Sequence, residues 1–436
     1  MNKHLVAAAL AAAFLGAPLH ARAGDAELLQ RIEKLAAELE QLKAELKASH
    51  GNTAGAVAGA PATAAPSVAA APAAPAAAVA MSAYAPAPAA TVLTGYGEIN
   101  YNRPSKNASA AQADVRRAVI GIAHRFDDKT KLVSEFEWEH GVVSADDRGE
   151  SEVEQLFVER QFDNGLRAKA GLFLMPVGLL NTNHEPTAYY GVERNFVETA
   201  IIPTTWREAG IGLSGEFGDG FTWDTGLTTG FDLGKWDGSA EEGRESPLAS
   251  IHQEGQLAKA RNLSVHGALN WRGVPGLLLG GSLFTGQAGH KLEGFAAQDA
   301  RVTLFDLHGR YTPGHWDLSA LYARGAISNV DALNASLAGE PTPVPSSFAG
   351  WYTQAAYQLY KSGDYTFSPF ARYEQFNTAN SYGATALGAT PGVSEKVLTI
   401  GANLRIGEGV VLKADYQKFS EDSTRDRLNL GLGFSY

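Results

Sequence analysis

The C-terminal stretch Arg425–Tyr436, RDRLNLGLGFSY, decides the fold. From Leu428 onward every second residue is large and apolar, and the series ends on Phe434 and Tyr436. The alternate positions hold small or polar residues such as Asn429. Because successive side chains of a β-strand point to opposite faces, this stretch predicts a strand with one apolar and one polar face. Such a strand suits lipid on one side and a wet lumen on the other.

Segments of similar length and alternation follow one another from Thr91 to the end of the chain, each bounded by turn residues. Their length is that of strands that cross a membrane at a tilt. Long apolar stripes with helical spacing do not occur among them. The sequence predicts sixteen strands, at 92–101, 115–126, 130–140, 153–162, 166–175, 206–217, 221–232, 260–272, 276–287, 300–311, 315–325, 350–361, 365–377, 395–406, 410–419 and 425–436.

The connections between these strands alternate in length. Seven are tight turns rich in Gly, Asp, Asn and Pro, at 127–129, 163–165, 218–220, 273–275, 313–314, 362–364 and 407–409. The other eight are mostly long, at 102–114, 141–152, 176–205, 233–259, 288–299, 326–349, 378–394 and 420–424. Short turns on one side and long loops on the other predict an all-β fold, a 16-stranded antiparallel transmembrane β-barrel over 91–436.

Tryptophan placement supports a membrane barrel, because such barrels carry aromatic girdles at both interfaces. Six of the seven tryptophans lie at predicted strand ends. We expect the outer rim to hold Trp138, Trp206 and Trp351. We expect the periplasmic rim to hold Trp223, Trp271 and Trp316.

The N-terminal 90 residues are organised differently. Residues 1–23 combine Lys3, an apolar run and an Ala-Arg-Ala cleavage site, which predicts a secretory signal peptide. Residues 24–48 carry apolar residues at spacings of four and three, which predicts a coiled-coil helix. Its seam is Leu28, Ile32, Leu35, Leu39, Leu42 and Leu46. A single amphipathic helix packed on the barrel is the alternative, and residues 49–90 form an Ala/Pro-rich linker that cannot build a core.

Composition excludes several classes of protein. The formal net charge of −11 argues against a nucleic-acid partner. The chain has no cysteine, so disulfides and thiolate chemistry are excluded, and this suits an oxidising compartment. Beyond the signal peptide no run of about 18 apolar residues occurs, which excludes membrane-spanning helices. No cofactor is expected, and His184-Glu185 lacks a third ligand for a metal site.

The stretch Phe173–Phe217, FLMPVGLLNTNHEPTAYYGVERNFVETAIIPTTWREAGIGLSGEF, resembles the corresponding part of the phosphate-selective porin O and P family of Gram-negative outer membranes. The resemblance implies an outer-membrane barrel, in lipid and self-associated as a homotrimer, that passes small ions or solutes down their gradient. It also implies that Phe434 and Tyr436 form the signal that the barrel assembly machinery reads. The coiled coil and linker resemble the periplasmic extension of some trimeric porins of this type.

The loop 176–205 is too apolar to extend into solvent, so we expect it to fold inward and narrow the lumen. Charged side chains at a constriction set ion preference. The candidates are Glu185, Glu193, Arg194, Glu198 and Arg207. The alternative is that Arg194 and its acidic neighbours pair with each other and hold the loop to the wall.

Alternation also predicts which charges face the lumen. The principal bases are Arg117, Arg125, Arg167, Lys169, Arg310, Arg372 and Arg405. Acidic residues are as plentiful on inward positions, so adjacent strands can neutralise one another. A one-sided ladder of arginines is absent, and the family resemblance therefore does not identify the solute.

These observations predict a passive porin for small, anionic solutes and no enzyme. An enzymatic barrel would need a nucleophile and base, and Ser264 and His266 share one inward face without a recognisable motif. The alternative function is an envelope tether, in which the coiled coil binds peptidoglycan or a partner and the pore is secondary.

Overall fold

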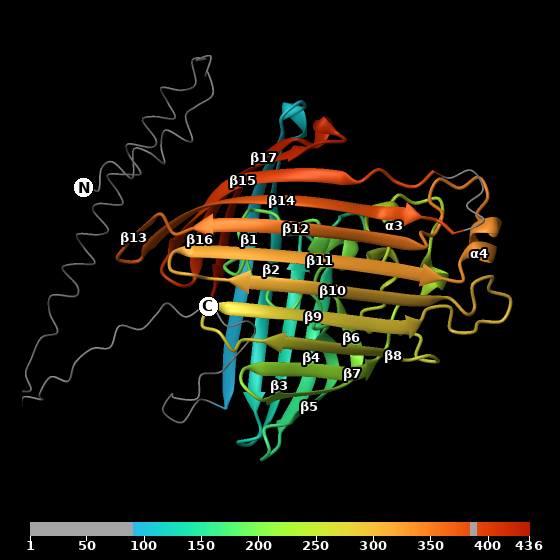
Figure 1. Ribbon diagram of the computed structural model, residues 1–436, viewed down its shortest axis with the longest axis horizontal. Coiled ribbons are helices and arrows are strands. Elements are labelled where there is room, and N and C mark those ends of the chain that lie inside the picture. The colour runs from blue at the N-terminus through green and yellow to red at the C-terminus, as the bar shows by residue number, and fades with distance from the viewer. Residues whose placement is uncertain (1–89, 384–389) are drawn as a thin grey trace, which may run out of the picture. The chain divides into compact units, whose positions relative to one another are not determined.

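A computed structural model describes residues 90–383 and 390–436. The predicted signal peptide, coiled-coil seam and most of the linker lie outside these residues. Strands dominate the described part (Figure 1). The first nine are β1 (Thr91–Pro104), β2 (Gln112–Arg125), β3 (Thr130–Glu139), β4 (Ser151–Gln161), β5 (Arg167–Leu174), β6 (Arg207–Phe217), β7 (Phe221–Thr228), β8 (Ser264–Trp271) and β9 (Leu277–Gln287). The others are β10 (Arg301–Tyr311), β11 (Trp316–Ser328), β12 (Ser347–Tyr357), β13 (Tyr360–Ser362), β14 (Tyr365–Ser381), β15 (Glu395–Ile406), β16 (Val410–Phe419) and β17 (Arg427–Ser435).

The strands close into a 16-stranded antiparallel barrel. β12 and β13 both pair with β14, so they are one strand interrupted at Gln358 and Leu359. The barrel closes because β1 pairs with β2 on one side and with β17 on the other. At the seam the Gly95 amide donates to the Tyr436 carbonyl at 3.1 Å, and the Tyr436 amide returns the bond at 2.9 Å. The predicted fold class is confirmed.

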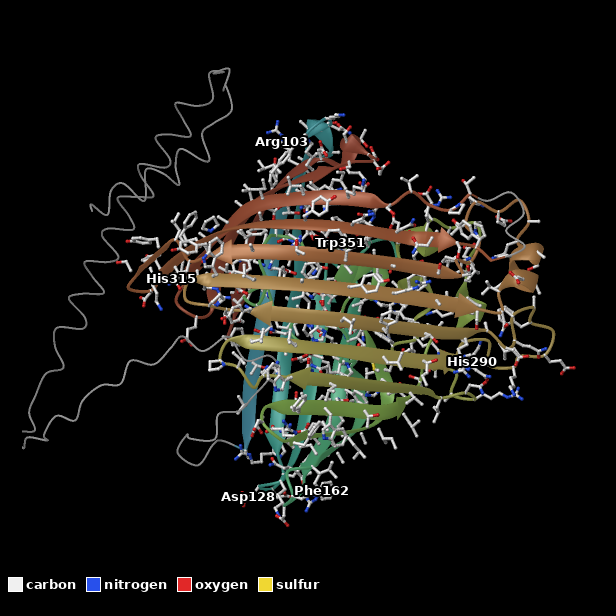
Figure 2. All side chains as sticks on the ribbon, viewed as in Figure 1. Arg103, Asp128, Phe162, His290, His315 and Trp351 are labelled. Atoms are coloured by element: carbon white, nitrogen blue, oxygen red, sulfur yellow. The ribbon has the colours of Figure 1, made fainter. Side chains whose placement is uncertain are left out.

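The predicted tight turns join consecutive strands at one end, and the long loops lie at the other. Figure 2 displays His315 at the turn end of the front strands and His290 at the loop end. Gly165 and Gly407 have φ values of 81° and 66°, a conformation that only glycine adopts without strain, which explains their place in these turns. The clearest boundary difference is β7, which ends at Thr228 because residues 229–232 enter a buried cluster instead.

The barrel is apolar outside and polar inside. Ile211 and Leu307 lie on the outer face and are 59% and 62% exposed. On the inner face Asp306 and Glu374 are 1% and 0% exposed. This distribution reverses that of a soluble protein and matches a barrel surrounded by lipid. No helix in the described ranges is long and apolar enough to cross a membrane.

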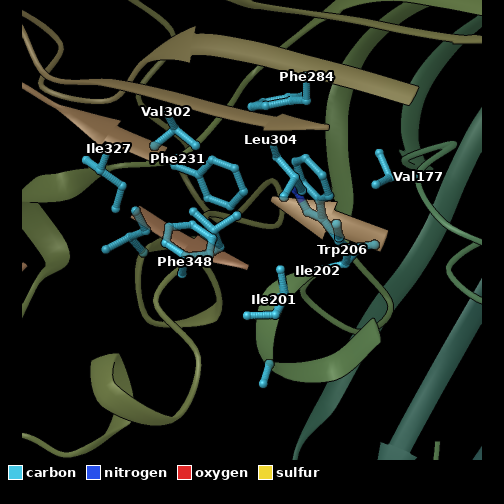
Figure 3. Close-up of a cluster of buried hydrophobic side chains, with 14 of the residues drawn as sticks. Val177, Ile201, Ile202, Trp206, Phe231, Phe284, Val302, Leu304, Ile327 and Phe348 are labelled. Carbon is cyan, nitrogen blue, oxygen red and sulfur yellow. The ribbon is translucent and has the colours of Figure 1, made fainter. Parts of the chain in front are cut away.

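Short helices occupy the loops. They are η2 (Ala108–Ala110), η3 (Val197–Ile201), η4 (Leu233–Lys235), α3 (Glu242–Glu245), η5 (Ala249–Ile251), α4 (Asp331–Ser336) and η6 (Ser423–Arg425). Loop residues from 176–205 and 229–251 pack with inward residues of β9 to β12 in an apolar cluster (Figure 3). The cluster therefore fixes two loops to the inside of the barrel wall.

The prediction for Trp206 is wrong. Its side chain is fully buried in this cluster, with its ring 5.0 Å from that of Phe231 and 4.6 Å from that of Phe284. β6 begins one residue later, so Trp206 belongs to the end of the inward loop and not to a girdle. Trp138 and Trp351 are 40% and 37% exposed on the outer surface, as expected of girdle residues.

Candidate functional site

The loop 176–205 joins β5 to β6 and lies against the inner face of the barrel. Of its residues only Thr204 is exposed, and the others are buried or half-buried. Its amides reach inward side chains on distant strands. The Gly178 amide donates to Asp306 on β10 at 3.1 Å, and the Val192 amide donates to Asp415 on β16 at 2.6 Å. The loop thus makes contacts on widely separated parts of the wall.

Glu198 joins the two ends of this loop. One carboxylate oxygen accepts hydrogen bonds from the Leu179 and Leu180 amides, at 2.6 and 2.7 Å. The other accepts from the Asn195 amide group at 2.8 Å and from the Tyr352 hydroxyl of β12 at 3.0 Å. Burial raises the pKa of Glu198, although these hydrogen bonds oppose the shift. The carboxylate holds the loop in its folded form.

The middle of the loop is attached to β1 and β15. The Tyr189 hydroxyl donates to Glu98 on β1 at 2.7 Å. The Tyr189 carbonyl accepts from the Asn403 side chain of β15 at 3.0 Å. Arg405, also on β15, donates to the Thr187 carbonyl. Polar wall residues are therefore satisfied by the loop backbone, as buried polar groups require.

His184 connects the loop to β4. Its Nε2 lies 2.7 Å from Glu154 Oε1, and the same atom lies 2.7 Å from the Tyr96 hydroxyl. Its Nδ1 lies 2.9 Å from the Asn181 carbonyl. Burial opposes charging of the ring, but the Glu154 carboxylate outweighs burial and raises the pKa of His184. Glu154 is fully buried, so the structure brings an ion pair into the base of the loop.

The five residues predicted at a constriction fall into two groups. Glu185, Glu193 and Arg194 are partly buried and remain candidates for contact with solutes. Glu198 and Arg207 are 3% and 2% exposed. Arg207 pairs with Glu152 and with Glu254, so carboxylates neutralise its charge. We infer that Glu198 and Arg207 support the loops, and the assignment of the five residues to a constriction stays a prediction.

Most predicted lumen bases lie in ion pairs. Arg310 binds Asp317 through two hydrogen bonds, at 2.9 and 2.6 Å. The other pairs are Arg117 with Glu98 at 2.8 Å, Lys169 with Asp224 at 2.9 Å, Arg372 with Glu374 at 3.1 Å and Arg167 with Glu216 at 3.5 Å. Three of these five pairs join adjacent strands, as expected, whereas Lys169 reaches past β6 to Asp224 on β7 and Arg372 pairs with Glu374 within β14.

Arg194 and Arg405 differ from these paired bases. In the described part of the chain Arg194 donates only to neutral groups, the Thr204 hydroxyl and the His184 carbonyl. Arg405 donates to a carbonyl of the loop. Arg125 is partly buried at the turn end of β2. Within residues 90–383 and 390–436, no ion pair with a carboxylate neutralises these three bases.

Sequence reasoning missed Glu154. Simple alternation along β4 would place Glu154 and Gln155 on opposite faces, but a β-bulge between β3 and β4 leaves both buried and facing inward. A one-residue bulge has no reliable signal in a single sequence. The only hint is the run Glu152-Val153-Glu154-Gln155, which is too polar for a strict alternation.

The inward positions of Ser264 and His266 are confirmed, but they do not form a catalytic pair. His266 Nε2 lies 3.1 Å from Asp224 Oδ1, and its other nitrogen has no partner among the described residues. In those residues no group of three potential metal ligands occurs.

Comparison with known proteins identifies relatives of the barrel. The family model described as "Putative beta-barrel porin-2, OmpL-like" matches residues 90–431. An uncharacterised protein of Aquifex aeolicus (strain VF5) is 26% identical over 348 residues, which cover 76% of each chain. Salmonella typhi OmpF, solved in complex with daunomycin, has 13% identity and a TM-score of 0.56, and the match covers 79% of this chain and 97% of OmpF. This likeness supports the fold alone.

These matches correct the family resemblance. They support a porin-type barrel of the outer membrane, as the sequence predicted. They do not support the phosphate-selective porin O and P family, because the matching family model is a different one.

Proposed function

Because the chain belongs to the beta-barrel porin-2, OmpL-like family, we propose that it is a passive diffusion channel for small solutes, with anions favoured. The loop 176–205 narrows its lumen. The observation that carries this proposal is the attachment of the loop to inward side chains of β1, β10, β12, β15 and β16. A loop held in this way lies fixed inside the barrel, so it narrows the lumen but leaves it open.

The anion preference rests on Arg194 and Arg405. Their guanidinium groups bind neutral partners and keep their full charge toward the lumen. Most other inward bases form direct ion pairs with carboxylates, which neutralise their charge. Glu185 and Glu193 belong to the same loop, so we expect the preference to be modest.

We propose that the barrel assembles as a homotrimer in outer-membrane lipid, with the coiled coil and linker in the periplasm. Phe434 and Tyr436 provide the assembly signal. Tyr436 directly follows β17, the strand that closes the barrel, and is 66% exposed, which leaves it accessible to the assembly machinery.

Liposome swelling tests the channel and its preference together. Purified barrel in vesicles should admit small neutral sugars at rates that fall steeply with solute size. Arg194→Ala should slow a small monoanion relative to a sugar by roughly fivefold, because one charge near the path contributes about 1 kcal/mol in water. Arg148→Ala, which removes an exposed loop base, is the matched control. Equal rates for large and small sugars would contradict a constriction, and no swelling would contradict a channel.

A further inference from the structure

Loop 176–205 contacts β4 through two side chains that can carry opposite charges, His184 of the loop and Glu154 of the strand. His184 is 4% exposed, and each ring nitrogen faces an oxygen: Nδ1 the Asn181 carbonyl and Nε2 the Glu154 carboxylate. The Tyr96 hydroxyl also lies 2.7 Å from Nε2, but it donates its own proton to Glu154 Oε2 at 2.9 Å. Nδ1 therefore faces an acceptor carbonyl, and Nε2 faces a carboxylate and a hydroxyl oxygen whose proton is already engaged, so both ring nitrogens carry protons. The geometry therefore selects the imidazolium form of His184.

Backbone irregularity in β4 is what directs Glu154 to this ring. The bulge places Gln155 opposite Glu135 and Val153 opposite Phe136, and leaves Glu154 as the extra residue. Its carboxylate receives the Tyr96 hydroxyl at 2.9 Å in addition to His184. Bulges commonly redirect a side chain next to a functional site, and here the redirected side chain meets the loop.

Several other charged or titratable groups surround the pair. β1 contributes Tyr96 and Glu98, β2 contributes Arg117, β3 contributes Glu135 and Glu137, and the loop contributes Glu185, Tyr189 and Arg194. Arg117 donates to the His184 carbonyl at 3.2 Å and lies 2.8 Å from Glu98 and 3.8 Å from Glu137. Arg117 is thus shared between Glu98 and Glu137, and His184 is the base that lies directly beside Glu154.

We propose that His184 and Glu154 form a protonation-dependent catch that anchors loop 176–205 to the wall in acidic and neutral solution and releases it in alkaline solution. The proposal rests on the function proposed above, in which this loop narrows the lumen. His184 and Glu154 act as positioning residues, because neither needs to touch the solute.

The pH dependence of anchoring has a direction that is set by the difference in the pKa of His184 between the anchored and the released loop. A released His184 in water has its ordinary pKa, and the anchored ring has a raised pKa. The contribution to anchoring is fully present below the ordinary pKa and is lost as pH rises through the raised one. Within that window the equilibrium between anchored and released loop changes by about tenfold for each pH unit.

Single-channel recording across pH is the first test. Between about pH 6 and about pH 9, brief transitions to other conductance levels should become severalfold more frequent in the unmodified protein. His184→Gln should have frequent transitions at both pH values. His266→Gln is the matched control, because His266 pairs with Asp224 on the wall and should retain the pH response. A pH response that survives in His184→Gln would overturn the proposal.

A measurement that does not need conduction separates this proposal from the channel itself. The chain has no cysteine, and the Thr187 and Ser435 hydroxyl oxygens lie 3.1 Å apart across the loop and wall. Thr187→Cys/Ser435→Cys should form a disulfide that abolishes the pH-dependent transitions, and reduction should restore them. In the single variant Thr187→Cys, thiol labelling relative to Ser239→Cys on an exposed loop should accelerate severalfold at alkaline pH. Unchanged relative labelling would overturn the catch even if the barrel conducts, whereas pH-dependent labelling without conduction would refute the channel alone.

Discussion

Glu198 stabilises the loop through hydrogen bonds that leave its charge unavailable to solutes. Leu179, Leu180, Asn195 and Tyr352 all donate to it, and a buried donor that loses its acceptor costs about 1–3 kcal/mol. We expect Glu198→Ala to lower the free energy of unfolding by about 3 kcal/mol or more, as measured by urea denaturation in detergent followed by tryptophan fluorescence.

Glu185→Ala is the control for this prediction. Glu185 is partly buried and accepts none of these loop hydrogen bonds, so its removal should change the unfolding free energy by less than about 0.5 kcal/mol. Equal losses for the two variants would mean that Glu198 has no special part in holding the loop.

At the residue scale, alternation predicted which charges face inward but not what they bind. Arg117, Lys169 and Arg372 lie inside as expected, because strand periodicity is two. Their partners come from other strands and from the loop. A single sequence does not define which residues of two strands lie opposite each other or where the loop contacts the wall. The bulge at Glu154 breaks the periodicity itself, and the His184 contact was therefore not predictable.

Loop 176–205 is held by apolar packing as well as by polar contacts. Ile201 and Ile202 are fully buried in the cluster with Trp206 and Phe348. Truncation of a buried isoleucine to alanine costs about 2–5 kcal/mol. Ile201→Ala should therefore loosen the loop, and we expect proteolysis by an added protease to cut within the loop of the folded barrel. Unaltered resistance to the protease would show that polar contacts alone hold the loop.

At the element scale, the sequence predicted sixteen membrane strands, and fifteen of them match single strands of the structure. The remaining one, 350–361, is divided into β12 and β13, because Gln358 and Leu359 leave the ladder without a glycine or proline to mark the break. The apolar residues of 176–205 correctly indicated a buried loop. The assignment of Trp206 to a girdle was wrong. Trp206 lies directly before β6 and belongs to the inward loop, and its position near a strand end did not reveal this.

The whole barrel depends on an outer face that suits lipid. Leu307 lies at the centre of β10 on this face and is 62% exposed. An arginine at the middle of a lipid-facing strand costs about 2–4 kcal/mol. We expect Leu307→Arg to lower the stability of the refolded barrel in vesicles by this amount. Leu257→Arg should have little effect, because Leu257 is 99% exposed in a loop outside the strands. Equal effects would contradict the placement of β10 in lipid.

Single-channel recording of the full chain in a planar bilayer with a KCl gradient tests the central claim most directly. We expect stepwise conductance, in groups of three for a homotrimer, and a reversal potential of modest anion preference that shifts toward cations in Arg194→Ala. Cation preference in the unmodified protein would contradict the proposed role of Arg194 and Arg405. Correctly folded protein without conductance would contradict the channel and favour the envelope tether.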